Sequence, residues 1–214
     1  MSRGATARLF VAIDPPEEVR DELLAWARRA VAVSARQQGP AVADMRLLER
    51  EALHLTLCFL GWRPAGEIEL IGSTLASCAM DVGELSLGAP LWLPPRRPGV
   101  LAVEVQDRDG GLAALHRAVS CALADATGWQ PERRRFRAHI TVARARGSGR
   151  SRRRDRFRGS GRSGMAANGA QLVLPATPRL SFTPASVVLY RSRLAPGGAS
   201  YQALAECELL AAGH

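Results

Sequence analysis

The sequence predicts an α+β fold with a bilobal shape: two pseudo-symmetric lobes, each an antiparallel sheet with flanking helices, around a central cleft. Short apolar segments typical of strands alternate along the chain with segments of helical periodicity. A His-x-Thr-x motif occurs twice, at residues 54–57 and 139–142, and each copy belongs to a predicted strand accompanied by a helix. This recurrence suggests two similar lobes, and the length of 214 residues fits a single domain over residues 1–214.

Strands are predicted where apolar and β-branched residues run between turn signals. In chain order these segments are 8–13, 45–48, 53–60, 85–93, 100–105, 136–143, 180–182, 187–190 and 201–210. We expect the second and third segments to pair with each other, and Gly61 to end the third. The third and sixth segments carry the two motifs.

Helices are predicted where apolar residues recur three and four positions apart. The first helix starts with Asp14 as its N-cap and Pro15 at its first position, since both residue types favour helix starts. A loop over residues 34–43 should follow it. The three helical segments are about 15–32, 68–78 and 112–127.

Each motif should place a histidine and a threonine on one face of its strand, because residues i and i+2 point the same way. Two such strands facing each other would combine two imidazoles and two hydroxyls in one pocket. Imidazoles can donate or accept protons near neutral pH, and hydroxyls can stabilise charged oxygens. One copy alone is more simply an amphipathic strand, but two copies indicate phosphodiester cleavage without a metal. The candidate catalytic residues are His54, Thr56, His139 and Thr141.

Composition narrows the class of protein. The chain is 47% hydrophobic, enough for a core, but it has no apolar run long enough to cross a membrane. No apolar segment with a cleavage site follows the N-terminus, so we expect no signal peptide. The four cysteines are scattered without metal-binding spacing. This spacing favours reduced thiols in a cytoplasmic protein, and we expect neither a metal nor a cofactor.

The net charge of +9 comes from one part of the chain. Residues 133–162 hold thirteen arginines and one acidic residue, Asp155, whereas the remainder is slightly acidic. We expect a flexible insert rich in Arg, Gly and Ser over about residues 145–168. It could follow an RNA backbone through phosphate contacts. It could equally be a solvated loop in a chain that uses arginine throughout and has no lysine.

The chain resembles the two-histidine (2H) phosphoesterase superfamily, and more narrowly the RNA 2′,3′-cyclic phosphodiesterases, also called LigT-like 2′-5′ RNA ligases. Besides the motifs, matching segments occur in the family's order over nearly the whole chain: residues 8–13, 53–61, 136–144, 189–192 and 196–201. The resemblance implies the bilobal fold, with both histidines facing a central groove. Residues 45–52 lack the aromatic-valine pair often found there, and the arginine-rich stretch is longer than usual, which leaves the substrate preference open.

The resemblance also implies roles for the motif residues. The implied reaction is metal-independent hydrolysis of a 2′,3′-cyclic phosphate at an RNA end, leaving a 2′-phosphomonoester. His54 would be the proton donor to the leaving 3′ oxygen, and His139 the proton acceptor from water. The residues alone do not say which histidine is the acid. Thr56 and Thr141 would donate hydrogen bonds to the phosphate oxygens.

Three further residues are candidates for substrate binding. Family likeness favours a phosphate contact for Arg144, although an ideal strand would place it on the face opposite Thr141 unless a bulge intervened. Phe10 lies on the first strand and could belong either to the core or to the cleft. Tyr201 follows a Gly-Gly loop, where a structural role and a substrate contact are both open.

The implied partner is RNA with a 2′,3′-cyclic phosphate end, such as a tRNA fragment, bound by a monomer that has no contact with membranes. The same chemistry in reverse would join a 2′-phosphate-bearing end to a 5′-hydroxyl as a 2′-5′ RNA ligase. Two alternatives stay open. One is a phosphodiesterase of the same fold that acts on 2′-5′ oligoadenylates or other cyclic nucleotides. The other is a non-catalytic RNA-binding protein that uses the arginine tract.

Overall fold

The computed structural model describes residues 5–38, 45–94, 99–145, 174–195 and 198–210. Their strands are β1 (Thr6–Ile13), β2 (Met45–Leu47), β3 (Leu55–Pro64), β4 (Leu85–Leu93), β5 (Val100–Asp107), β6 (His139–Ala145), β7 (Ser181–Phe182), β8 (Ser186–Ala195) and β9 (Gly198–Glu208). The α-helices are α1 (Glu17–Gln38), α3 (Ile68–Ala76) and α4 (Gly111–Thr127), with short 3₁₀ turns at η1 (Arg50–Ala52) and η2 (Ala65–Glu67). Every predicted strand and helix has a counterpart here.

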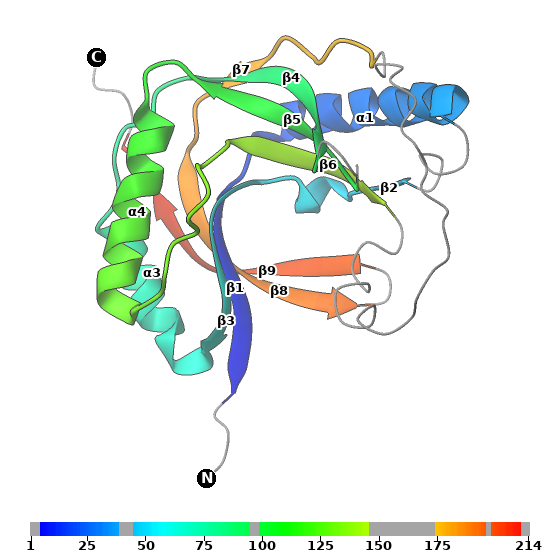
Figure 1. Cartoon of the computed structure of the whole chain (residues 1–214). Helices are drawn as coiled ribbons and strands as arrows, with labels where there is room; N and C mark the ends of the chain where they lie inside the picture. Colours follow the sequence, from blue (N-terminus) through cyan, green and yellow to red (C-terminus); the bar gives the residue numbers. More distant parts are fainter. Residues whose placement is uncertain (1–4, 39–44, 95–98, 146–173, 196–197, 211–214) are drawn as a thin grey trace.

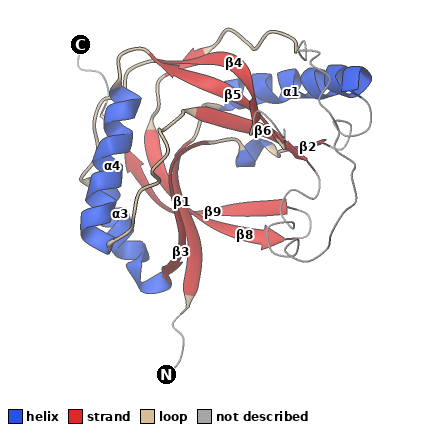
Figure 2. Cartoon of the chain, viewed as in Figure 1, coloured by secondary structure: helices blue, strands red, loops and turns tan. Residues whose placement is uncertain are grey.

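The strands form one curled antiparallel sheet (Figures 1 and 2) in the order β7-β4-β5-β6-β3-β1-β8-β9, with β2 paired to β6. The predicted α+β fold is therefore confirmed. Lobe one contains β1, β3, β8 and β9, and the second lobe contains β2, β4, β5, β6 and β7. The lobes join where β3 pairs with β6, and this ladder consists of a single residue pair, Leu55 with Ile140.

The helices cover the face of the sheet that carries the apolar residues. Helix α1 contacts β2 and β6, α3 contacts β8 and β9, and α4 contacts β3 and β5. On β1 the alternation is clear, because Leu9, Val11 and Ile13 are fully buried in the main hydrophobic cluster, which does not include Phe10 or Ala12. The opposite face of β1 and its neighbours is left for polar and aromatic groups. Within the described residues, no helix has both the length and the apolar character needed to cross a membrane.

Helix α1 differs from its prediction at both ends. It begins at Glu17, and the Asp14 carboxylate does not cap it but accepts a hydrogen bond from the Tyr190 hydroxyl at 2.5 Å. The Asp14 carboxylate therefore bonds to a residue distant in sequence, although the local pattern predicted that it would cap the helix. The helix also continues through the predicted loop start to Gln38, because Ser34 is fully buried and donates its hydroxyl proton to the Ala30 carbonyl at 2.8 Å.

Two strand predictions were also wrong. Strand β2 was expected to pair with β3, but it pairs with β6 and so belongs to the second lobe. Strand β3 does not end at Gly61 but continues to Pro64, since Gly61 takes a φ of +72° at a bulge, a conformation that glycine adopts without strain. The predicted insert over residues 145–168 lies outside the described residues, apart from Ala145 at the end of β6.

Candidate active site

The two motifs lie at the starts of β3 and β6, the neighbouring strands through which the lobes join. Both motifs alternate as strand geometry requires. The residues between each histidine and threonine, Leu55 and Ile140, are completely buried. The four polar residues are partly exposed on the other face, which we call the histidine face: His54, Thr56, His139 and Thr141.

The register brings the two motifs together in a crossed arrangement. Because Leu55 lies opposite Ile140 in an antiparallel pair, extending the register by one residue sets His54 opposite Thr141 and Thr56 opposite His139. Directly opposed Cβ atoms are about 5 Å apart, and diagonal ones about 7–8 Å apart. The two histidines are therefore diagonal neighbours on this face, each directly opposite the threonine of the other motif.

Each imidazole is oriented by a backbone carbonyl two residues earlier in the chain. His139 Nδ1 lies 2.7 Å from the Arg137 carbonyl oxygen. Since a carbonyl can only accept, Nδ1 carries the proton, and Nε2 of the neutral ring is free to accept one. His54 also forms a hydrogen bond with the backbone of Ala52, which favours its charged form. In both motifs the histidine ring thus bonds to the backbone two residues before it.

A bulge in β6 returns Arg144 to the histidine face. Thr141 and Ala143 pair with consecutive residues of β5, so Val142 is an extra residue in the ladder. Val142 and Ala143 are both completely buried, which shifts the alternation by one position. Arg144, which lies three residues after Thr141 and would point to the opposite face of an ideal strand, is exposed and acts electrostatically on His54.

The same bulge occurs in the first motif. Thr56 and Cys58 pair with consecutive residues of β1, so Leu57 is the extra residue. Leu57 and Cys58 are both buried, and the residue that follows, Phe59, is 39% exposed. Phe59 therefore holds the position in lobe one that Arg144 holds in the other.

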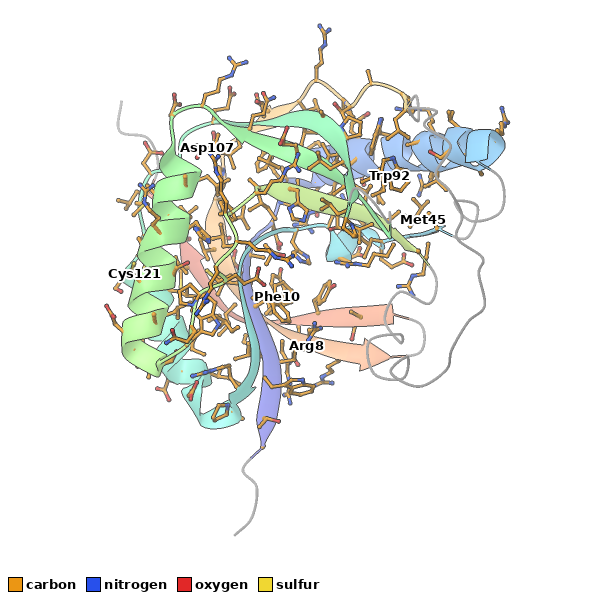
Figure 3. All side chains as sticks on the ribbon, in the orientation of Figure 1. Arg8, Phe10, Met45, Trp92, Asp107 and Cys121 are labelled. Carbon is orange, nitrogen blue, oxygen red and sulfur yellow. The ribbon has the colours of Figure 1, made fainter. Side chains whose placement is uncertain are left out.

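Aromatic rings surround His54. The centroid of the Phe10 ring lies 4.8 Å from that of His54, the Tyr201 ring lies 5.1 Å away edge-on, and the Tyr190 ring lies 6.3 Å away. These rings come from β1, β9 and β8, and Figure 3 labels Phe10 where these strands converge. Phe10 is only 3% exposed, so its ring supports His54 and presents little surface to a ligand.

These surroundings weaken the basicity of His54. The pKa of the His54 imidazole is lowered to about 4. Burial is the main cause, and the positive charges of Arg144, Arg20 and His139 act in the same direction, while the bond to Ala52 acts in the opposite direction. His54 is therefore neutral at pH 7 in the free protein.

A polar network holds one side of this aromatic group. The Tyr190 hydroxyl donates to Asp14, whose carboxylate lies 3.5 Å from the Arg20 guanidinium. Arg20 also donates from Nε to the Pro15 carbonyl at 2.7 Å. Burial and the bond to Asp14 raise the pKa of Tyr190, so its hydroxyl stays protonated. Tyr190 in turn stacks on Phe10, with centroids 5.2 Å apart, and so fixes the ring beside His54.

A pocket lies next to the aromatic rings around His54, and Tyr201 belongs to both. A pocket of about 210 Å³ is lined by Arg46, Glu49, Glu51, Ala52, Ala199, Ser200 and Tyr201. Its wall includes the residue that bonds His54 and the ring that packs edge-on against it. Among the described residues, no group of three His, Cys, Asp or Glu side chains is placed to hold a metal ion.

The structure places the seven predicted site residues on the same face of the sheet. Register and contacts bring together the four motif residues, Arg144, Phe10 and Tyr201. Sequence reasoning missed three members of the surroundings of His54: Asp14, Arg20 and Tyr190. The only signal for Tyr190 was its place in a family-like segment, and the pattern around Asp14 pointed to a helix cap.

The low pKa of His54 predicts a pH-dependent contribution to stability. In the unfolded chain the His54 imidazole has its ordinary pKa of 6.5, whereas in the folded chain its pKa is about 4. This contribution is fully present above pH 6.5 and is lost as the pH falls towards 4, on the order of 3 kcal/mol in all. In urea unfolding, wild type should lose that much more free energy of unfolding than His54→Gln between pH 7 and 4. Equal losses in the two proteins would contradict this.

Comparison with known proteins agrees with this geometry. No protein-family model matches the chain. The curated RNA 2′,3′-cyclic phosphodiesterase of Aeropyrum pernix is 32% identical over 105 residues, which is 49% of this chain and 59% of that protein. The chain is thus matched to less than two thirds of the length of this relative.

Solved structures match over nearly the whole chain. E. coli LigT in its apo form has a TM-score of 0.68 at 22% identity, covering 95% of this chain and 98% of that one. A structure described as a phosphoesterase has a TM-score of 0.69 at 23% identity, covering 96% and 99%. E. coli LigT complexed with 3′-AMP has a TM-score of 0.68 at 24% identity, again covering 96% and 99%. The resemblance indicated by the two motifs is therefore confirmed at the level of the fold, which is that of LigT.

Proposed function

We propose that this protein hydrolyses 2′,3′-cyclic phosphate ends of RNA to 2′-phosphomonoester ends by general acid–base catalysis from two histidines. The observation that carries the proposal is the crossed pair of motifs on one face, fixed by the pairing of Leu55 with Ile140. The similarity of half the chain to a curated RNA 2′,3′-cyclic phosphodiesterase supports the choice of substrate.

The geometry suits in-line attack on phosphorus. A water molecule on one side of the phosphate would give its proton to His139, whose Nε2 is free because Nδ1 is bonded to the Arg137 carbonyl. The bond from phosphorus to the 3′ oxygen breaks on the other side, where His54 would protonate the leaving oxygen. The phosphate stays on the 2′ oxygen. Each transfer by a positioned imidazole contributes about 10²- to 10⁴-fold in rate.

Three side chains are placed to stabilise the charge that develops on the other phosphate oxygens. The hydroxyls of Thr56 and Thr141, on the same face as the histidines, would each donate one hydrogen bond. Arg144, turned to this face by the bulge at Val142, can offer a forked pair of donors. Donors that are in place before the reaction lower its barrier, because they need no rearrangement in the transition state.

The proposed donor role of His54 requires that substrate binding change its protonation. In the free protein the pKa of His54 is about 4, mainly because the ring is buried. A phosphodiester anion bound beside the ring favours the charged imidazolium and raises this pKa. His54 would then take up a proton as the substrate binds, which couples binding to formation of the acid.

The first test is hydrolysis of a 2′,3′-cyclic-phosphate-ended RNA oligonucleotide in the presence of EDTA. We expect a product that carries its phosphate on the 2′ oxygen, determined by NMR or by chromatography against standards. His54→Ala and His139→Ala should each lower kcat about 10²- to 10⁴-fold. His116→Ala is the matched control, since this histidine stacks on Phe136 at 4.1 Å and is no part of the site. Unchanged activity in either site variant, or activity abolished by EDTA, would overturn the proposal.

A second test separates the acid from the base. With a phosphodiester whose leaving group is p-nitrophenolate, departure needs no proton. The rate defect of His54→Ala should therefore shrink with this substrate, whereas that of His139→Ala should persist, because the attacking water must still lose its proton. The opposite pattern would show that the two histidines have exchanged roles. The expected cytoplasmic location, the monomeric state and the reverse ligation stay predictions.

A further inference from the structure

The histidine face of lobe one continues past the motif and carries groups that the proposed chemistry does not use. Along β1 and β3 the opposed pairs are Ala12 with Thr56, Phe10 with Phe59, and Arg8 with Trp62. Residues directly opposite each other in an antiparallel pair point to the same face. This row therefore runs from the motif threonine towards the far end of β3, and Figure 3 labels Phe10 and Arg8 in succession along β1.

The far end of this row is open. Trp62 is 67% exposed and Phe59 is 39% exposed. Trp62 faces away from the helices, because the next residue, Arg63, turns to the other side and donates to the Thr127 carbonyl at the end of α4 at 2.7 Å. Two large aromatic side chains are thus left towards solvent on the face where the histidines lie.

Arg8 adds an available positive charge between the aromatic residues. Its guanidinium lies 4.6 Å from the centroid of the Phe59 ring and donates to the Ser192 hydroxyl at 3.2 Å. In the part of the chain that the structure describes, Arg8 forms no salt bridge with a carboxylate. Stacking on Phe59 holds the guanidinium plane in place, and a held guanidinium is well suited to bind phosphate.

We propose that Arg8, Phe59 and Trp62 form a second binding subsite, which holds the RNA strand upstream of the end that reacts. A nucleobase would stack on the exposed indole of Trp62, and a backbone phosphate would contact Arg8. Aromatic side chains interleaved with a cation along one sheet face are the arrangement that binds single-stranded nucleic acid. The subsite rests on the proposed function only in that the same RNA reaches the histidines.

The distance between the two sites makes the effect depend on substrate length. Trp62 is eight residues after His54, and two bulges shorten that path, so the indole lies roughly 20 Å along the strand from the histidine. A mononucleotide at the histidines is too short to reach it. The subsite therefore adds affinity for RNA chains and none for the reacting nucleotide itself.

The test compares Trp62→Ala with wild type on substrates of increasing length, from a nucleoside 2′,3′-cyclic phosphate to a hexanucleotide with the same end. We expect kcat/KM for the mononucleotide to stay within twofold, and that for the hexanucleotide to fall about 5- to 100-fold, the range for loss of one base stack. Trp62→Phe should restore most of the loss, and Leu70→Ala, an exposed apolar residue on α3, should have no effect. A Trp62→Ala defect equal on both substrates, or absent on the hexanucleotide, would overturn the subsite.

Binding measured without turnover separates this proposal from the catalytic one. Fluorescence anisotropy of a labelled hexanucleotide should show weaker binding to Trp62→Ala by a similar factor, and a shallower salt dependence of binding to Arg8→Gln. If wild type hydrolysed neither substrate but the affinity still depended on Trp62, the catalytic proposal would fail and the subsite would stand. If RNA affinity were the same in wild type and Trp62→Ala, this face would serve something other than RNA.

Discussion

The site depends on one backbone register. Leu55 and Ile140 are the only paired residues between β3 and β6 in the described chain, both are completely buried, and each lies between a histidine and a threonine. Because a shift of either strand by one residue would turn its own histidine and threonine into the core, the apolar residues of the motifs fix the position of the polar ones. Burial of His54 makes its charged form costly.

Much of this could be predicted from the sequence, because strand alternation is a local rule. Within each motif the histidine and the threonine share a face because they are two residues apart in a strand. Duplication of the motif also indicated that two strands would meet. The α+β class and the helices after the first also followed from local periodicity, since their apolar residues pack on the sheet as expected. No local rule, however, specified that β2 would cross to the second lobe.

The remaining features depend on contacts between residues distant in sequence. Asp14 has the local pattern of a helix cap, but its carboxylate accepts a hydrogen bond from the hydroxyl of Tyr190, which lies 176 positions later in the chain. The side of the strand taken by Arg144 depends on a bulge at Val142, which is visible only once the register with β5 is known. The same bulge at Leu57 shows that the two motifs share backbone geometry as well as sequence, with Phe59 in the place of Arg144. The lobes are therefore alike in framework and different in chemistry.

The most direct test of this account is whether one phosphate group contacts both imidazoles. The ring signals of His54 and His139 can be followed by NMR during titration with a nucleoside 2′-monophosphate. The account predicts that both rings respond with one common Kd, and that the pKa of His54 rises from about 4 when the phosphate is bound. A response from only one ring, or two unrelated Kd values, would show that the two histidines do not share a site.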